Sequence, residues 1–228
     1  MKKIAIMTAG GDCAGLNAAI KSVVMAASKN NIVVVGIIDG FIGFVERKYM
    51  VLDNKIVENI ERQGGTILGS SNKECPFHYP SKEKKDEYED RVDDSIKALR
   101  KIGVEAMIII GGDGTLDSAR VIDEAGMPTI GIPKTIDNDM VASNPTIGFD
   151  TGVENAVEAI RKLKTTAASH RRVMVVEMMG RTSGYLTLYS GFAAGADIIL
   201  LPERDYDLNI VCNRVKEIMS TDKRYVII

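Results

Sequence analysis

Glycines and one acid in a short segment have the spacing that phosphate chemistry requires. Residues 111–115 read Gly-Gly-Asp-Gly-Thr. Glycine lets backbone amides approach an anion, but a carboxylate among the glycines needs a cation between itself and a phosphate. Mg²⁺, held by one or two carboxylates and by phosphate oxygens, meets that need. We therefore expect Asp113 to hold Mg²⁺; the alternative is an aspartate that only caps the turn.

A second acidic segment supplies groups for transfer to a hydroxyl. Residues 133–139 read Pro-Lys-Thr-Ile-Asp-Asn-Asp, so Asp137 and Asp139 lie two residues apart with Lys134 nearby. Phosphoryl transfer needs a carboxylate near the hydroxyl proton, a metal ion and cations on the moving charge. This segment offers the carboxylate, for which Asp137 is the better placed, and one cation. The alternative is an Asx-rich turn that caps a helix.

Another glycine-rich turn, at residues 8–15, reads Thr-Ala-Gly-Gly-Asp-Cys-Ala-Gly. Gly10 and Gly15 have the spacing of a P-loop, but Leu16 and Asn17 replace its Lys and Ser/Thr, and GxGxxG is absent. The following helix adds a partial positive charge at its N-terminus. The turn suits a phosphate, although a glycine turn that opens a helix is also common architecture.

Two arginines flank a predicted strand at residues 173–177. Arg172 precedes it, and Arg181 lies in the Met-Gly-Arg segment that follows it. Strand rise separates them by about 30 Å, too far to serve one phosphate within a subunit. If both bind substrate, one reaches across a subunit interface.

Strand-like and helix-like segments alternate along the chain, which predicts an α/β fold. Continuous apolar runs predict buried strands at residues 4–7, 32–38, 107–110, 129–132, 173–177 and 198–201. Helical periodicity marks residues 17–30 and 85–101 and the segment after Asp150. The pattern indicates doubly wound, mostly parallel sheets that bind ligands at the carboxyl ends of their strands. We expect domains at 1–140 and 141–228; because the apolar residues 224–228 look like a strand that has just begun, we expect the second domain to be incomplete.

Composition excludes several classes of function. The 228 residues carry a formal net charge of −2, which gives no general field for nucleic acid or for an anionic membrane. Three distant cysteines without a CxxC pair indicate neither a disulfide scaffold nor a zinc site. Apolar stretches of transmembrane length and a signal-peptide pattern are absent from the sequence. We expect a cytoplasmic protein that binds neither nucleic acid nor membranes.

Taken in order, these segments resemble the phosphofructokinase family from Lys3 to the last residue. The resemblance rests on segments 8–17, 64–70, 111–115, 133–139 and 179–181. Gly-Gly-Asp-Gly-Thr is shared with NAD kinases and diacylglycerol kinases, whereas Thr-Ile-Asp-Asn-Asp with Met-Gly-Arg is specific. The resemblance implies two doubly wound α/β/α domains and Mg²⁺-assisted phosphorylation of fructose 6-phosphate by ATP at the 1-hydroxyl, which gives fructose 1,6-bisphosphate.

The resemblance also implies roles for single residues. Asp137 would be the base, with Thr135 and Asp139 beside it. The nucleotide and its metal would be held by Gly11, Phe41, Asn72, Lys73, Gly112, Asp113, Gly114, Thr115 and Lys134. The sugar phosphate would be held by Met179, Gly180 and Arg181. Arg172 would reach a neighbour's site within a homotetramer of the kind that this family builds.

Some positions depart from the family pattern. Asn72 replaces the arginine that steadies the transferring phosphoryl group in most relatives; Lys73 or Lys134 could substitute only as a point charge. Two arginines of the bacterial effector site are Met25 and Asn54 here, which puts regulation by ADP or phosphoenolpyruvate in doubt.

The donor signals are mixed. Gly114 is typical of members that use ATP, because pyrophosphate users have an aspartate there that repels the α-phosphate. Lys134, in contrast, stands where many pyrophosphate users have lysine. We favour ATP, because Gly114 removes the direct obstacle to it. Pyrophosphate-dependent transfer and a non-catalytic, regulatory member of the family remain the alternatives.

Overall fold

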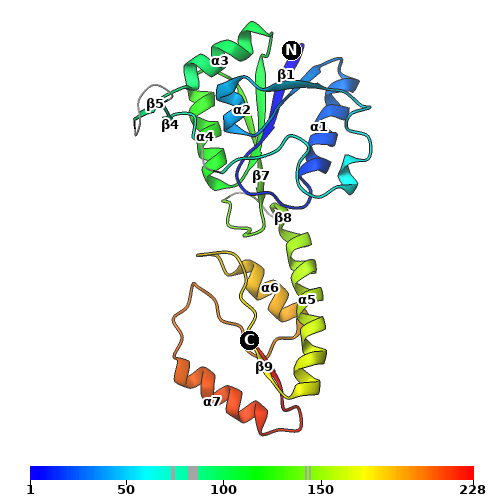
Figure 1. Cartoon of the computed structure of the whole chain (residues 1–228), viewed down its shortest axis with the longest axis vertical. Helices are drawn as coiled ribbons and strands as arrows, with labels where there is room; N and C mark the ends of the chain where they lie inside the picture. Colours follow the sequence, from blue (N-terminus) through cyan, green and yellow to red (C-terminus); the bar gives the residue numbers. More distant parts are fainter. Residues whose placement is uncertain (73–74, 82–86, 142, 144) are drawn as a thin grey trace. The chain divides into compact units, whose positions relative to one another are not determined.

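The computed structural model describes residues 1–72, 75–81, 87–141, 143 and 145–228. It divides into two compact units, Met1–Thr135 and Ile136–Ile228. Each unit contains its own hydrophobic core (Figure 1). The division falls at Thr135, close to the boundary expected after residue 140.

A mostly parallel sheet forms the centre of the first unit. Its strands are β1 (Lys3–Thr8), β2 (Val33–Ile37), β3 (Tyr49–Leu52), β6 (Ala106–Gly111) and β7 (Thr129–Thr135), in the order β3-β2-β1-β6-β7. All these pairs are parallel except β2 with β3. The predicted strands at 4–7, 32–38, 107–110 and 129–132 are confirmed. The sequence does not predict β3, because Leu52 is the only buried residue of this edge strand.

Alternating side chains of β1 bury against two different layers of helices. Ala5 and Met7 belong to a core with residues of α2 (Phe41–Glu46), α3 (Val92–Lys101) and α4 (Asp113–Glu124). Ile4 and Ile6 belong to a second core with α1 (Leu16–Lys29) and the 3₁₀-helix η1 (Ile60–Arg62). The period-two alternation of a strand therefore produces an α/β/α sandwich around this sheet (Figure 1).

One predicted helix is shorter than its periodicity suggests. The helix expected over residues 85–101 begins only at Val92, and Tyr88 lies in β5 (Tyr88–Glu89), which pairs antiparallel with β4 (Tyr79–Pro80). The exposed ring of Tyr88 stacks on His78, with centroids 3.8 Å apart. The Asp90 carboxylate accepts a hydrogen bond from Val92 N (2.9 Å), so this side chain satisfies a donor at the start of α3.

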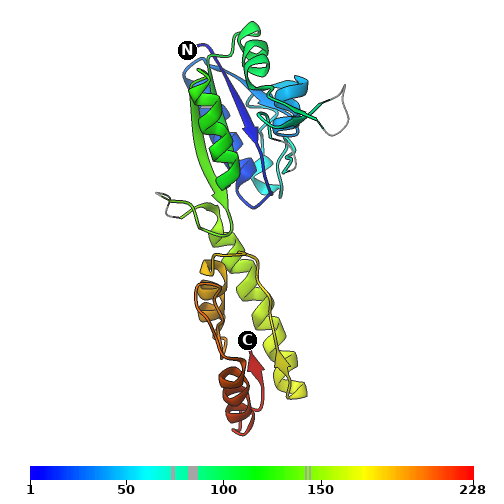
Figure 2. The same cartoon turned by 90° about the vertical axis from the view of Figure 1, so that its left-hand side faces the viewer.

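The second unit is built around a long helix. Its elements are β8 (Ile147–Gly148), α5 (Phe149–His170), β9 (Val173–Met174), α6 (Tyr185–Ala194), α7 (Leu208–Met219) and β10 (Val226–Ile227). Helix α6 packs along α5, as both views show (Figure 1, Figure 2). Strand β10 pairs in parallel with β9, so the expected C-terminal strand is present.

Of two strands predicted in this unit, one is shorter than expected and the other does not form in the part of the chain that the structure describes. The strand expected at 173–177 ends at Met174, although Ile228 N donates to Met174 O (2.9 Å) and Val176 N donates to Ile228 O (2.8 Å). The strand expected at 198–201 is absent from the described chain. Ile198 N donates to Ile227 O (3.3 Å), and no ladder of further bonds follows among the described residues. Apolar character alone cannot make a strand without a partner.

Candidate functional site

The first glycine-rich turn follows β1 and leads into α1. Gly10 and Gly15 have φ values of 80° and 93°, the left-handed region that glycine adopts most readily. A Cβ at Gly10 would lie 3.1 Å from Thr115 Oγ1, whereas a Cβ at Gly11 would meet nothing within 4 Å. The turn is therefore packed against the protein at Gly10 and open at Gly11.

The second glycine-rich turn joins β6 to α4. Gly112 precedes the helix, and Asp113 and Gly114 are exposed in its first turn. Thr115 is buried, and a Cβ at Gly111 would overlap its side chain. Because β1 and β6 are paired, with Thr8 opposite Ile110, the two turns leave the same edge of the sheet side by side.

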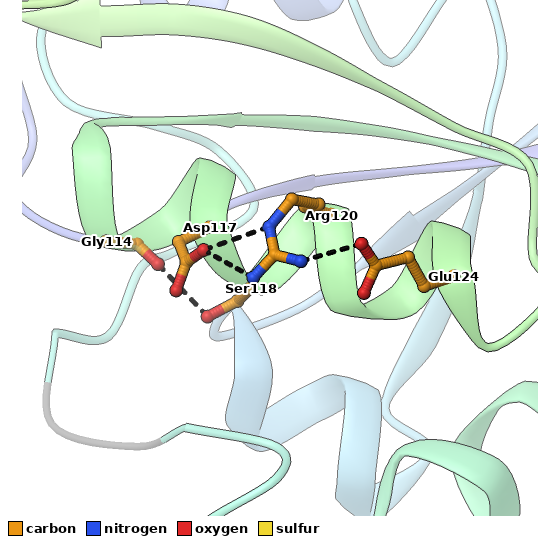
Figure 3. A network of polar contacts seen from close by, with 5 residues as sticks. All are labelled: Gly114, Asp117, Ser118, Arg120 and Glu124. Carbon is orange, nitrogen blue, oxygen red and sulfur yellow. Dashed lines mark hydrogen bonds and ion pairs between the residues drawn. The ribbon is translucent and has the colours of Figure 1, made fainter.

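Helix α4 carries a polar network just beyond this turn (Figure 3). Ser118 Oγ donates to Gly114 O (3.0 Å), and Arg120 pairs with Asp117 (3.0 Å) and Glu124 (2.6 Å). The pKa of the Arg120 guanidinium is raised, mainly by its hydrogen bonds to Glu124 and Asp117. These exposed pairs lie on the solvent side of the helix, where surface ion pairs contribute little to stability.

A cavity of about 500 Å³ opens beside the first turn. Its lining residues are Gly10, Gly11, Asp12, Gly65, Thr66, Ser70, Ser71 and Asn72. Gly10 N donates to Ser71 O (2.9 Å), and Ser70 Oγ donates to Gly10 O (2.6 Å), so the segment that ends at Asn72 is tied to the turn. The polar lining of small residues suits an anionic ligand. Thr66 and Ser71 escape sequence reasoning, since single hydroxyl residues in an irregular loop carry no pattern.

Lys134 is the cation of the predicted set that the structure brings to the first turn. It extends from β7, is only 4% exposed, and its Nζ donates a hydrogen bond to Gly11 O. Burial raises the pKa of the neighbouring Cys13 thiol; the Lys134 charge acts to lower it and Asp12 acts to raise it. The positive charge of Lys134 therefore acts on groups of the first glycine-rich turn.

Two other residues predicted for the nucleotide site, Phe41 and Lys73, are not among the described residues that line the cavity. Phe41, which would line the site, is only 4% exposed and packs into the core with Phe44. Its ring is therefore not available to a ligand. Lys73 lies outside the described residues.

In the second unit, one hydrogen bond connects the predicted base to the predicted sugar-phosphate segment. Ser183 Oγ donates to the main-chain oxygen of Asp137 (2.7 Å), and Ser183 N donates to Gly180 O (2.8 Å). Ser183 is buried. Asp137 and the turn at 180–183 are thus held together, a link for which the sequence offers no signal because a lone serine after Met-Gly-Arg has no spacing rule.

The segment that carries the two acids is closed on itself. Asn138 adopts a left-handed φ of 51°, and its Oδ1 accepts from Thr146 N (3.0 Å) and Thr146 Oγ1 (3.3 Å). These bonds join Asn138 to a residue eight positions further on, so they close a loop rather than form the helix-capping Asx turn of the alternative. Asp139 is exposed, and Asp137 and Thr135 are half-buried.

The predicted sugar-phosphate residues lie on a tight, open turn. Met179 is 73% exposed, Gly180 has a φ of 135°, and Arg181 has a φ of 51°. A Cβ at Gly180 would overlap Ser183 O, so only glycine fits there. Arg172 is exposed at the start of β9, and its carbonyl accepts from Val226 N (3.2 Å).

The described residues also bear on two classes of function. Every helix within them is too short or too polar to cross a membrane. A cluster of three or more His, Cys, Asp or Glu side chains that could hold a metal by themselves is likewise absent from them. Asp113 could still hold Mg²⁺, because one exposed carboxylate beside a phosphate cradle is the donor set that this ion takes when phosphate oxygens complete its shell.

Comparison with known proteins gives consistent matches over the whole chain. A family model described as "Phosphofructokinase" matches residues 3–228. The chain is 46% identical over 231 residues to "ATP-dependent 6-phosphofructokinase 2" of Clostridium perfringens, and 45% identical over 227 residues to the protein of that name in Streptomyces coelicolor. These matches cover 100% and 99% of this chain but 63% and 64% of those proteins, so the chain spans less than two thirds of their length.

Solved structures with the same fold confirm the predicted architecture. Phosphofructokinase from Saccharomyces cerevisiae superposes with a TM-score of 0.85 at 29% identity, covering 100% of this chain and 33% of that one. The pyrophosphate-dependent phosphofructokinase of Marinobacter aquaeolei gives 0.84 at 21% identity, covering 100% and 59%. The second likeness concerns the fold alone.

Proposed function

Because the chain belongs to the phosphofructokinase family, we propose that it carries the centre of an ATP-dependent 6-phosphofructokinase. The proposed reaction moves the γ-phosphoryl group of ATP to the 1-hydroxyl of fructose 6-phosphate. The observation that carries the proposal is the pairing of β1 with β6, which sets two glycine turns, a cavity and Lys134 at one sheet edge. Relatives named for the ATP-dependent activity support it.

The first unit supplies the donor-binding groups. Amides of Gly11, Gly112 and Gly114 and the N-terminus of α4 would hold the phosphates. A Cβ at Gly114 would meet nothing within 4 Å, so the protein leaves the space next to this residue open. Asn72 and Lys134 would contact the moving phosphoryl group. Asp113 would hold Mg²⁺, which when bound neutralises charge on the phosphate oxygens.

The second unit, together with Thr135 at the end of the first, supplies the acceptor-binding groups and the base. Asp137 would take the proton from the 1-hydroxyl, and Asp139 and Thr135 would orient the acceptor. The turn formed by Met179, Gly180 and Arg181 would hold the sugar phosphate. The hydrogen bond from Ser183 to Asp137 O keeps this turn close to Asp137. We further propose that Arg172 acts in a neighbouring subunit's site of a cytoplasmic homotetramer; its exposure at the start of β9 is compatible with that role.

A coupled assay on the chain extended to the full length of its relatives tests the proposal. MgATP or Mg-pyrophosphate is supplied as the sole donor with fructose 6-phosphate, and fructose 1,6-bisphosphate is measured. We expect turnover with ATP. Turnover with pyrophosphate alone would reassign the donor, and binding of the sugar phosphate without turnover from either donor would indicate a regulatory member of the family.

A further inference from the structure

We propose that Asn17 is a positioning residue of the donor cavity, whose carboxamide fixes the segment 63–67 against the first glycine-rich turn. The inference rests on the proposed donor site, because it names the residue that holds one wall of it. Asn17 is the second residue of α1 and lies two residues after Gly15, where that turn ends. Its side chain points away from solvent and is 2% exposed.

The carboxamide of Asn17 makes two hydrogen bonds to one distant segment. Its Nδ2 donates to Gln63 O (3.1 Å), and its Oδ1 accepts from Ile67 N (2.8 Å). One planar amide thus binds the backbone before Gly65 through its donor and the backbone after Thr66 through its acceptor. Those two residues line the cavity. The amide therefore fixes the span of backbone that carries them.

The segment has no regular structure to hold it in place. Its other described anchors include Thr8, whose Oγ1 donates to Gly69 O (2.8 Å) and lies 2.9 Å from Thr66 Oγ1, and Asp39, whose N donates to Leu68 O (2.7 Å). Ser70 and Ser71 both bond to Gly10. These anchors act on residues 66–71. The Asn17 bonds act on the beginning of the segment, where η1 ends and Gly65 turns the chain with a φ of 69°.

Replacement by aspartate removes one of the two bonds without changing the shape of the side chain. A carboxylate can still accept from Ile67 N, but it cannot donate to Gln63 O. Burial disfavours the charged form and so raises the pKa of an introduced carboxyl at this position. Once protonated, that carboxyl has an O–H that can donate to Gln63 O again. The defect in Asn17→Asp should therefore become smaller as the pH falls.

Other groups near this position also titrate, so the comparison needs a matched control at each pH. The charged or titratable residues on the elements around Asn17 are Lys21 and Lys29 of α1, Glu61 and Arg62 of η1, and Asp12 and Cys13 of the turn. Lys21 and Glu61 pair with each other at 2.7 Å. Asn30→Asp provides the control: it makes the same replacement at the end of α1, on an exposed side chain whose Nδ2 donates to Ala26 O.

The experiment measures MgATP affinity by calorimetry and amide hydrogen exchange of residues 63–72 in the unaltered chain, Asn17→Asp and Asn30→Asp. At pH 8 we expect Asn17→Asp to bind MgATP about tenfold or more weakly than Asn30→Asp, because a buried acceptor has lost its donor. Its exchange at residues 63–72 should be faster. At pH 5.5 both differences should shrink severalfold.

Equal affinity and equal exchange in the two variants at both pH values would overturn the proposal. If the unaltered chain does not bind MgATP, but exchange at 63–72 still responds to Asn17→Asp and recovers at low pH, the positioning role stands and the donor assignment fails. If MgATP binds and exchange does not respond, the positioning role fails alone. If Asn17→Asp does not fold, Asn17→Ser replaces it in the experiment. Failure of both variants to fold would overturn the proposal. Faster exchange over the whole first unit, instead of over residues 63–72, would overturn it as well.

Discussion

Asp137 has two separate tasks at the level of single atoms. Its main-chain oxygen accepts from Ser183, while its carboxylate is the group proposed to take a proton. A substitution of the side chain leaves the first task intact, because every residue has the same main-chain oxygen. Chemistry and positioning can therefore be separated at this residue.

Asp137→Ser should lower kcat by about 10²- to 10⁴-fold and change fructose 6-phosphate affinity little, because a general base is lost while the backbone link remains. Steady-state kinetics and calorimetry of sugar-phosphate binding measure the two quantities. The control is Asp222→Ser, at an exposed aspartate between α7 and β10, which should leave both unchanged. Unaltered kcat in Asp137→Ser would remove this residue from its role.

Cys13 should react slowly with alkylating reagents. Burial raises the pKa of its thiol, so at any given pH below that value a smaller fraction is the reactive thiolate than for an ordinary cysteine. At pH 8, iodoacetamide should modify the exposed Cys212 well before Cys13, and the rate at Cys13 should keep rising at higher pH. Peptide mass spectrometry follows each site.

The charge on Lys134 provides a second test at the same thiol. Lys134 acts to lower the pKa of Cys13, so Lys134→Met should slow the alkylation of Cys13 further and leave that of Cys212 unchanged. Faster alkylation of Cys13 in this variant would show that access, not charge, controls the thiol.

At the scale of elements, the junction of β6 and α4 depends on which glycine is changed. Gly111→Ala would drive a Cβ into the buried Thr115 side chain and should cost about 1–3 kcal/mol of unfolding free energy. Gly114→Ala meets open space inside a helix and should raise stability by up to about 1 kcal/mol. Urea unfolding of the two variants measures the difference; equal midpoints would contradict the packing at Gly111.

The same junction shows what a sequence can predict about this fold. The runs at residues 4–7 and 107–110 are apolar on both faces, so they mark β1 and β6, and the glycines after them mark the turns. Leu52 is the only buried residue of β3, and residues 198–201 have no partner ladder in the described chain. Strand pairing is a property of two segments, and an apolar run reports only one of them.

The candidate site divides in the same way. The glycines and Asp113 follow from local spacing, since each belongs to a turn directly after a strand. Ser183 and Asn17 act on backbone groups 46 and 50 residues away, respectively, and no local pattern encodes such contacts. Phe41 lies in the core, a placement that appears only in three dimensions.

For the whole molecule, the separate packing of the two units predicts two separable responses to damage. Ile109→Ala removes a fully buried side chain of β6 and should cost about 2–5 kcal/mol, with faster amide exchange within Met1–Thr135. Ile160→Ala on α5 should act within Ile136–Ile228. Hydrogen exchange with mass spectrometry reports both regions.

The matched control for the first variant is Ile130→Ala on β7, whose side chain is 66% exposed and which should change stability by less than about 0.5 kcal/mol. If Ile109→Ala and Ile160→Ala each accelerate exchange equally throughout the chain, the two units unfold as one and their cores are not independent.

The pairing of β1 with β6 also has a consequence for synthesis on the ribosome. Ile4 lies opposite Ala106, so 102 residues (106 − 4) separate the partners in the chain. At translation speeds of about 5–20 residues per second, β1 waits roughly 5–20 s before its second neighbour is made. During that time β1 pairs with β2 along one edge, and its other edge, which later pairs with β6, has no partner. The nascent first unit is therefore open to aggregation, and to capture by chaperones, until β6 emerges.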